Sequence, residues 1–243
     1  MAKEEDGVIP NLLLPEAFEG MRVMRISTLL ALVAVLSGGV AVAAPSYAAD
    51  AQSCRLLPVA DSPASLQRSQ SVGVLYSENT VSNLAYLEQY HAVAVKGQKS
   101  GVLDPRISTA FIESSDPQLA IGWLKESLDS QFATVTVYKD LDTLVQARPD
   151  VVVMLDTYNQ LVTQRNTQVE ARYVAKFYDA NLQYIGKAEG YGARQMSSVW
   201  VHDKAAAEIA AQVEQQLELQ VNALKQFDAS LKALVTSGQV ASN

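Results

Sequence analysis

Apolar positions along the chain repeat with two different periods, and these periods predict the elements of an α/β fold. Alternating apolar residues, or short runs that are apolar throughout, predict strands, whereas apolar residues that return every three or four positions predict helices. Residues 92–111 alternate poorly and contain two glycines and a proline, so we expect one strand plus loop there. The predicted strands are 72–76, 134–138, 151–155, 169–177 and 182–190, and the predicted helices are 82–91, 117–131, 141–148 and 204–235.

Two aspartates predict where helices begin. Asp116 precedes Pro117, which joins an N-cap side chain to a residue whose φ suits the first helical turn, and Asp203 caps the last helix. That last helix spans about 50 Å at 1.5 Å per residue. Its final turns, with Phe227 and Leu231, should therefore overhang a sheet of ordinary strand length. We expect this overhang either to form a contact surface or to wrap back over the helix that begins at Pro117.

The last two predicted strands form an antiparallel pair with a defined register. Side chains alternate between the two faces, so matching core faces requires paired residue numbers with an odd sum, as in Phe177 opposite Leu182. Small residues on the core face of the final strand let the long helix lie close to it. Residues 151–155 are apolar on both faces, which predicts a strand covered on both sides.

The order of these elements predicts the fold class. Strand, helix, strand, short helix, three strands and a long helix give a two-layer α/β domain. We expect a mixed sheet that ends in a C-terminal antiparallel meander and is packed by two main helices.

The beginning of the chain has a pattern typical of an export signal. Residues 26–44 form an apolar run without charge, with Arg22 and Arg25 before it and small residues after it. The spacing of those small residues predicts cleavage between Ala48 and Ala49. An uncleaved membrane anchor is the alternative, because the run is just long enough to span a bilayer.

These features divide the chain into five parts. The first part is acidic, which an export signal is not, so we infer that translation starts at Met21 or Met24. The parts are an N-terminal extension (1–20), a signal peptide (21–48), an extended lead-in (49–71), a single α/β domain (72–236) and a C-terminal tail (237–243).

Charge and cysteine content narrow the partners. The chain carries 19 basic and 26 acidic side chains, a net charge of −7, and no cluster of basic and aromatic residues, so nucleic acid is not expected as a partner. Cys54 is the only cysteine, so an intramolecular disulfide is excluded. The polar Gln52 precedes it where lipid attachment requires apolar residues, so we predict a periplasmic or secreted protein that is not lipid-anchored. Lipidation and intermolecular pairing of Cys54 remain the alternatives to an inert thiol.

Few residues carry the patterns that catalysis or metal binding requires. The two histidines, His91 and His202, have no partner at metal-ligand spacing, and no nucleophile motif is present, so we expect no cofactor and no metal. Asp156 follows four apolar residues, and a partly desolvated carboxylate there can act as a general acid or base. Its alternative is a strand-end aspartate that bonds the backbone or Arg172.

Tyrosine is the residue type that points to binding. The chain has ten tyrosines, and tyrosine combines a large contact area with a polar tip. We expect an interaction surface that includes Tyr138, Tyr158 and Tyr178, together with Phe227 and Leu231 on the long helix. The alternative is the ordinary preference of tyrosine for half-buried strands.

The second half of the chain carries a family resemblance. The segments PDVVVM (149–154) and ARYVAKFYD (171–179), followed by a small-residue strand and a helix rich in Ala and Gln, resemble small bacterial envelope lipoproteins of the YajG or penicillin-binding-protein-activator type. The resemblance covers residues 150–224. It implies a periplasmic domain that binds another envelope component and catalyses nothing, although this chain lacks their lipidated cysteine.

Together these patterns lead to one functional hypothesis and two alternatives. We predict an exported, non-catalytic protein-interaction module of the bacterial cell envelope. Its partner would be an envelope protein, and it would meet the membrane only through an uncleaved signal segment. The alternatives are a periplasmic small-ligand-binding protein and a small enzyme that uses Asp156.

Overall fold

The computed structural model describes residues 65–101, 103–163, 166–199 and 204–241. The predicted signal peptide, the cleavage site at Ala48 and Ala49, Cys54 and the cap at Asp203 lie outside these residues. The elements are β1 (Ser71–Tyr76), α1 (Glu78–Ser100), α2 (Pro105–Ser114), α3 (Pro117–Gln131), β2 (Thr134–Val137), α4 (Leu141–Ala147), β3 (Val151–Gln160), β4 (Gln168–Asp179), β5 (Tyr184–Gln195) and α5 (Ala206–Ala241).

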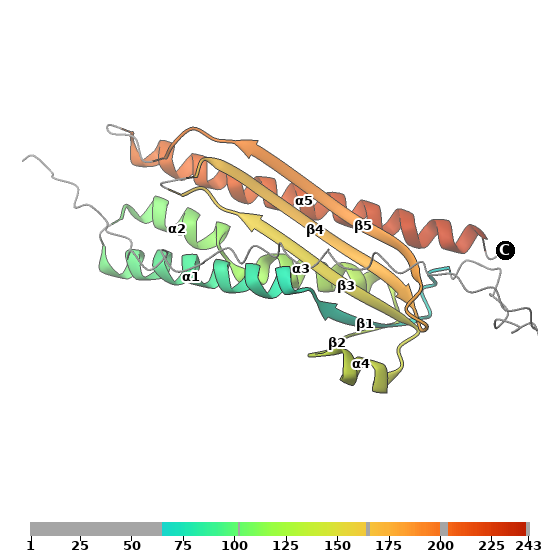
Figure 1. Ribbon diagram of the computed structural model, residues 1–243. Helices are drawn as coiled ribbons and strands as arrows, with labels where there is room; N and C mark the ends of the chain where they lie inside the picture. The colour runs from blue at the N-terminus through green and yellow to red at the C-terminus, as the bar shows by residue number, and fades with distance from the viewer. Residues whose placement is uncertain (1–64, 102, 164–165, 200–203, 242–243) are drawn as a thin grey trace, which may run out of the picture. The chain divides into compact units, whose positions relative to one another are not determined.

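Five strands form one mixed sheet in the order β2-β1-β3-β4-β5 (Figure 1). Strand β1 pairs in parallel with both β2 and β3, and β3, β4 and β5 then form an antiparallel meander. The predicted fold class, a two-layer α/β domain with a mixed sheet and a C-terminal meander, is confirmed.

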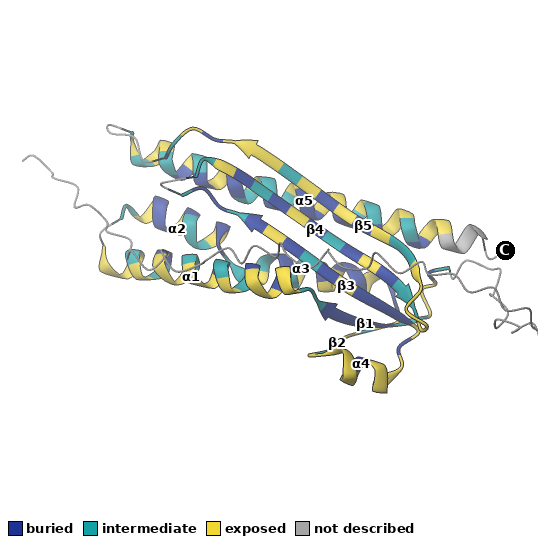
Figure 2. Cartoon of the chain, viewed as in Figure 1, coloured by how far each residue is buried: buried dark blue, intermediate teal, exposed yellow. Residues whose placement is uncertain are grey.

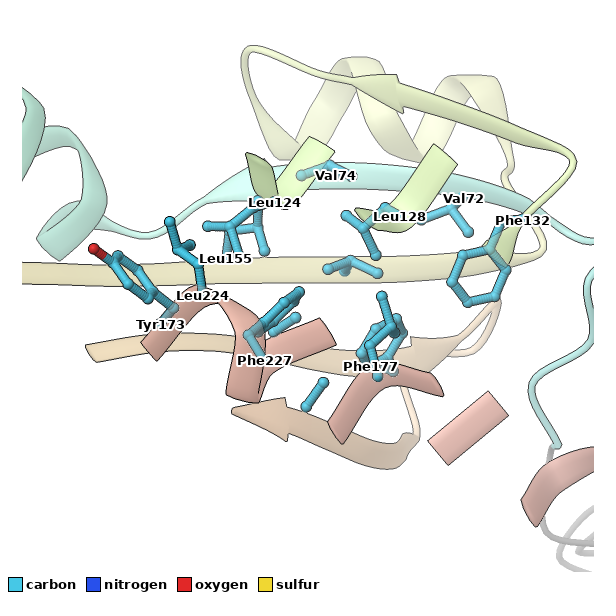
Figure 3. Close-up of a cluster of buried hydrophobic side chains, with 14 of the residues drawn as sticks. Val72, Val74, Leu124, Leu128, Phe132, Leu155, Tyr173, Phe177, Leu224 and Phe227 are labelled. Atoms are coloured by element: carbon cyan, nitrogen blue, oxygen red, sulfur yellow. The ribbon is translucent and has the colours of Figure 1, made fainter. Parts of the chain in front are cut away.

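One face of the sheet, which we call the inner face, packs against α3 and α5 and forms the main core. It contains the aromatic pair Phe177 and Phe132, whose ring centroids are 6.1 Å apart. Figure 3 shows these side chains between the strands and the two helices. The other fully or nearly fully buried members labelled there are Val72, Val74, Leu124, Leu128, Leu155, Tyr173, Leu224 and Phe227.

Residues 92–111 are helical along most of their length, so the prediction of a strand plus loop there is wrong. Helix α1 continues to Ser100 and ends at Gly101, whose φ of 66° is left-handed. Helix α2 begins where the Asp104 side chain accepts a hydrogen bond from the backbone N–H of Arg106, and Pro105 follows the cap. This aspartate–proline start is the same signal that predicts α3, where it is confirmed at Asp116.

The register of β4 and β5 has the predicted parity but a different pairing. Phe177 lies opposite Gly186 rather than Leu182, and the odd sum of residue numbers is kept along most of the pair. A bulge next to Phe177 then pairs Tyr178 with Tyr184. Leu182 was expected in the last strand, but it lies half exposed in the connecting loop with a φ of 61°. Strand β5 begins two residues later, at Tyr184.

Small residues on β5 allow α5 to lie directly on the strand, as the sequence predicts. A Cβ atom added at Gly190 would lie 1.9 Å from the carbonyl oxygen of Ala223 on α5, closer than any real contact. One added at Gly186 would lie 2.8 Å from a methyl group of Leu234. Ala188, between these glycines, is fully buried. The backbone of α5 therefore packs against the backbone of β5 at Gly190, and a leucine side chain of the helix fills the space at Gly186.

Helix α5 also covers the free edge of β5. The backbone N–H of Glu189 donates to Ser230 Oγ at 3.1 Å, and that of Tyr191 donates to Gln226 Oε1 at 3.4 Å. These two strand donors point away from β4, so helix side chains take the place of a further strand. Two backbone donors on this edge of the sheet are therefore satisfied by helix side chains one turn apart.

We predict that Gly190→Ala destabilises the fold by about 3 kcal/mol or more, because the added methyl group would force α5 away from β5. Urea unfolding followed by circular dichroism measures the change. The matched control is Gly122→Ala in α3, where an added Cβ meets nothing within 4 Å. That control should stabilise the fold by about 0.5 to 1 kcal/mol. Equal effects of the two substitutions would contradict the close approach.

Candidate functional site

The opposite face of the sheet, which we call the outer face, is covered only at one end. There Leu144 of α4 packs against Leu75 and Val152. Farther along β3, Met154 is 39% exposed, and Tyr191 on β5 is 52% exposed. Figure 2 shows buried and exposed positions alternating along the three meander strands. The prediction that residues 151–155 are covered on both sides is therefore correct at Val152 and wrong at Met154.

The three predicted tyrosines belong to the outer face but lie in two groups. Tyr138 and Tyr178 pack beside the small cluster under α4, and Tyr178 makes an edge-to-face contact with Tyr184 at 5.8 Å between centroids. Tyr158 lies six positions along β3 from the residue that pairs with Tyr178, about 20 Å away at 3.3 Å per residue. The guanidinium carbon of Arg172 lies 5.9 Å from the centroid of the Tyr158 ring.

Phe227 and Leu231 are part of the core, which corrects the expectation that they form an exposed contact surface. Their exposed fractions are 0% and 1%. The alternative expectation, contact with the helix that begins at Pro117, is what the structure shows, because Trp123 Nε1 on α3 donates to Asp228 on α5 at 2.8 Å. This part of α5 also lies over β5, where Leu234 meets Gly186. The other half of α5 packs against α2, where Val213 joins Ala110 in a second buried cluster.

Asp156 lies within β3, not at the end of a strand as its sequence position suggested. It belongs to the outer face and pairs with Val174 across the sheet. Both of its carboxylate oxygens lie 3.4 Å from the side-chain nitrogen of Asn79 on α1. No hydrogen bond between this carboxylate and Arg172 is recorded among the described residues. Asp156 is thus half-buried beside an amide, and it forms none of the ion pairs found among the described residues.

A groove of about 470 Å³ lies between α1 and the end of β3, next to Asp156. Helix α1 provides one wall with Tyr86 and Tyr90, whose ring centroids are 4.7 Å apart. Strand β3 provides the other wall with Tyr158 and Gln160, and Asn166 lies at the end where β3 leads into β4. We call this site the tyrosine–amide groove. Its volume lies in the range of small-molecule sites.

Helix α1 fixes one wall of the groove, because its side chains form hydrogen bonds with the backbone of β3 beyond the point where β1 ends. Thr80 Oγ1 accepts a hydrogen bond from Thr157 N and donates one to Leu155 O, both at 2.9 Å. One turn later, Asn83 Nδ2 donates to Asn159 O at 3.1 Å. A further turn along, the Tyr86 hydroxyl accepts from the backbone N–H of Leu161 at 3.2 Å. Side chains of α1 thus satisfy the edge of the strand.

Beneath the groove, these bonds continue into a buried polar network. Asn159 Nδ2 donates to Asn83 Oδ1 at 3.2 Å, and the hydroxyl of Tyr173 donates to Asn159 Oδ1 at 2.7 Å. All three residues are buried. Satisfied buried networks fix side chains in one arrangement, so the floor of the groove is rigid.

Sequence reasoning found Tyr158 but missed the rest of the groove. Asn79, Asn83, Tyr86 and Tyr90 follow one another at intervals of four, three and four residues, which places them on one face of a helix. That polar and aromatic stripe was the available signal. It was hidden because helix prediction looks for apolar stripes, and α1 uses hydrogen-bonding side chains to meet the sheet.

The described residues contain no group of three His, Cys, Asp or Glu side chains placed to hold a metal ion. His91 lies with Nδ1 at 3.1 Å from the carbonyl oxygen of Ile112, which ties α1 to α2. Within the same ranges, no helix is long and apolar enough to cross a membrane.

Comparisons with known proteins identify no family. No family model and no curated protein matches the chain. Among solved structures, two PelC dodecamers from Paraburkholderia phytofirmans share 12% identity over 65% of this chain and 94% and 92% of theirs, with TM-scores of 0.29 and 0.27. A minor lipoprotein from Acinetobacter baumannii shares 11% identity over 66% of this chain and 93% of its own, with a TM-score of 0.23. Likenesses this weak carry no functional argument, so the lipoprotein resemblance remains a prediction.

We predict that Thr80→Val destabilises the fold by about 2 kcal/mol, because it leaves the buried backbone N–H of Thr157 without a partner. The control is Thr136→Val on the exposed strand β2, which should change stability by less than about 0.5 kcal/mol. Urea unfolding of both variants measures the difference. Equal stabilities would show that α1 does not satisfy the edge of β3.

We also predict that stability falls above pH 10. Burial raises the pKa of Tyr86 and Tyr173 above the usual value of 10. The folded state therefore keeps these protons where the unfolded chain loses them, so stability is unaffected below about pH 10 and decreases as the pH rises beyond it. Each of the two tyrosines lowers the free energy of unfolding by at most about 1.4 kcal/mol per pH unit in this range.

Urea unfolding between pH 8 and pH 12, a range chosen to bracket the usual tyrosine pKa of about 10, tests this expectation. Tyr173→Phe should show a shallower decrease with pH, whatever its stability at neutral pH. Tyr184→Phe is the control, because 58% of this side chain is exposed to solvent. An unchanged slope in Tyr173→Phe would contradict the prediction.

Proposed function

We propose that this protein is an exported, non-catalytic interaction module of the bacterial cell envelope, and that the outer face of its sheet binds an envelope protein. Export is supported by the basic, apolar and small-residue order of residues 21–48. The single structural observation that carries the proposed contact is the exposure of large side chains on the outer face.

The composition of the outer face supports a protein partner. Tyrosine, methionine and arginine are enriched at the centres of protein interfaces. Strand pairing places Tyr158, Arg172 and Tyr191 in one row across β3, β4 and β5, and Met154 lies two rows away beside Lys176. The strands hold these side chains in fixed positions, so binding orders few additional groups.

The charges on the outer face describe the partner further. Arg172, Lys176 and Lys187 share the face with three acidic side chains, so its charges are balanced. A partner surface with an apolar centre and both signs of charge around it fits this arrangement. A partner is less suited to bind by adding a strand to the edge of β5, because side chains of α5 already bond to that edge. The three acidic residues are Asp156, Glu170 and Glu189.

Photo-crosslinking in living cells tests the proposal. Benzoylphenylalanine is placed at Met154 or Tyr191, both exposed on the outer face and outside the tyrosine–amide groove. The control position is Glu214, which is exposed on α5. We expect the same envelope protein to be attached at both outer-face positions and to be absent from the control.

Two outcomes would overturn this proposal. One is the absence of adducts at both outer-face positions while the exported protein accumulates outside the cytoplasm. The other is recovery of the same proteins from position 214. The mass of the exported protein serves as the export control, because cleavage between Ala48 and Ala49 gives a defined product.

A further inference from the structure

We propose that the tyrosine–amide groove binds a neutral sugar. This inference goes beyond the proposed function, because the groove is a concave site beside the outer face and takes a small molecule instead of a protein. It can be right or wrong independently of the envelope partner. Three properties of its described residues carry it: a lining without charged side chains, tyrosine walls and a rigid floor.

The groove is lined by uncharged polar and aromatic residues. Among the described residues that line it, none is Asp, Glu, Lys or Arg, and only one is aliphatic. The described lining offers no Arg or Lys, the residues that normally bind phosphate and carboxylate ligands. A purely apolar ligand would exclude water from the amides of Asn79 and Gln160, whose bonds to Asp156 and Tyr158 use only one end of each amide, and this costs free energy. The lining therefore selects an uncharged ligand that forms many hydrogen bonds.

Sugars meet both requirements of this lining. Each sugar hydroxyl both donates and accepts hydrogen bonds, as each Asn or Gln amide does through its two ends. The carbon-bound hydrogens of a sugar ring form an apolar patch that packs against the electron-rich face of a tyrosine. Tyr86 and Tyr90 on one side and Tyr158 on the other provide such faces. The volume of about 470 Å³ accommodates a short oligosaccharide.

The groove is already shaped before any ligand arrives. Its floor is the network of Asn83, Asn159 and Tyr173 described above, and the Tyr86 hydroxyl is fixed by the backbone N–H of Leu161. At the far end, Asn166 Nδ2 donates to Gln168 O at 2.6 Å and to Leu161 O at 3.3 Å. Preformed sites lose less entropy on binding, which favours weakly bound ligands such as sugars.

Two charged residues lie next to lining residues of the groove. Asp156 lies within 3.4 Å of the Asn79 amide, and Arg172 lies over the Tyr158 ring. Both belong to the outer face and are not among the described residues that line the groove.

Amide-resolved NMR titration of the exported protein tests the inference. The probes are four neutral tetrasaccharides: maltotetraose, cellotetraose, xylotetraose and the tetramer of N-acetylglucosamine. Trigalacturonate is the charged comparison. We expect at least one neutral probe to give saturable shifts confined to the groove, with a Kd in the range of about 0.1 to 10 mM.

Two variants identify the site. Tyr158→Ala removes an exposed ring from one wall and should weaken binding at least about tenfold. Tyr184→Ala removes a more exposed ring, 58% against 37% for Tyr158, from outside the groove. It should leave the Kd within about twofold, which is close to the scatter expected of a neutral surface substitution. The unchanged spectrum of each variant away from its substitution shows that the fold is kept.

Three results would overturn the inference. They are the absence of saturable shifts with all four neutral probes, tighter binding of trigalacturonate than of any neutral probe, and equal binding by Tyr158→Ala and the parent protein. The crosslinking positions Met154 and Tyr191 lie outside the groove, so a failure here leaves the proposed protein contact untouched, and the reverse also holds.

Discussion

The contact between the backbones of α5 and β5 is the constraint on which the rest of the structure depends. Because Gly190 has no side chain, the helix reaches the strand at the Ala223 carbonyl. This approach places Phe227 in the core and brings Ser230 to the edge of β5. With the inner face closed in this way, the outer face is left to face solvent over most of its area. The surface available for binding is therefore set by packing on the opposite side of the sheet.

The sequence predicts the meander and its faces well, because alternation is a local property of strands. The odd-sum register follows from where core side chains must point, and it also assigns Tyr158 and Tyr178 to the outer face. The exact pairing was not predictable, because it depends on the length of the loop around Leu182, which has a left-handed φ. A bulge beside Phe177 then changes the register by one residue.

Two other failures have a common physical reason, which is that tertiary contacts replace the expected local pattern. Helix α1 meets β3 through Thr80 and Asn83, so the apolar stripe that marks most helices is weak there. Phe227 and Leu231 were expected to overhang, because the sequence does not show where along β5 the helix lies. The approach of α5 to Gly190 places these turns over the strand and the first half of the helix against α2. The groove was missed for the first of these reasons, since its α1 wall belongs to the same polar stripe.

The sealed edge of β5 has a consequence for the behaviour of the protein at high concentration. An exposed strand edge is a template for cross-β growth between copies of a chain. Gln226 and Ser230 accept hydrogen bonds from this strand edge only while α5 packs on β5. Undocking of α5 would therefore uncover core and strand edge together, so any motion that frees this helix also exposes a surface that permits aggregation. The small residues of β5 that let the helix pack closely thus protect the protein from aggregation as well as holding its fold.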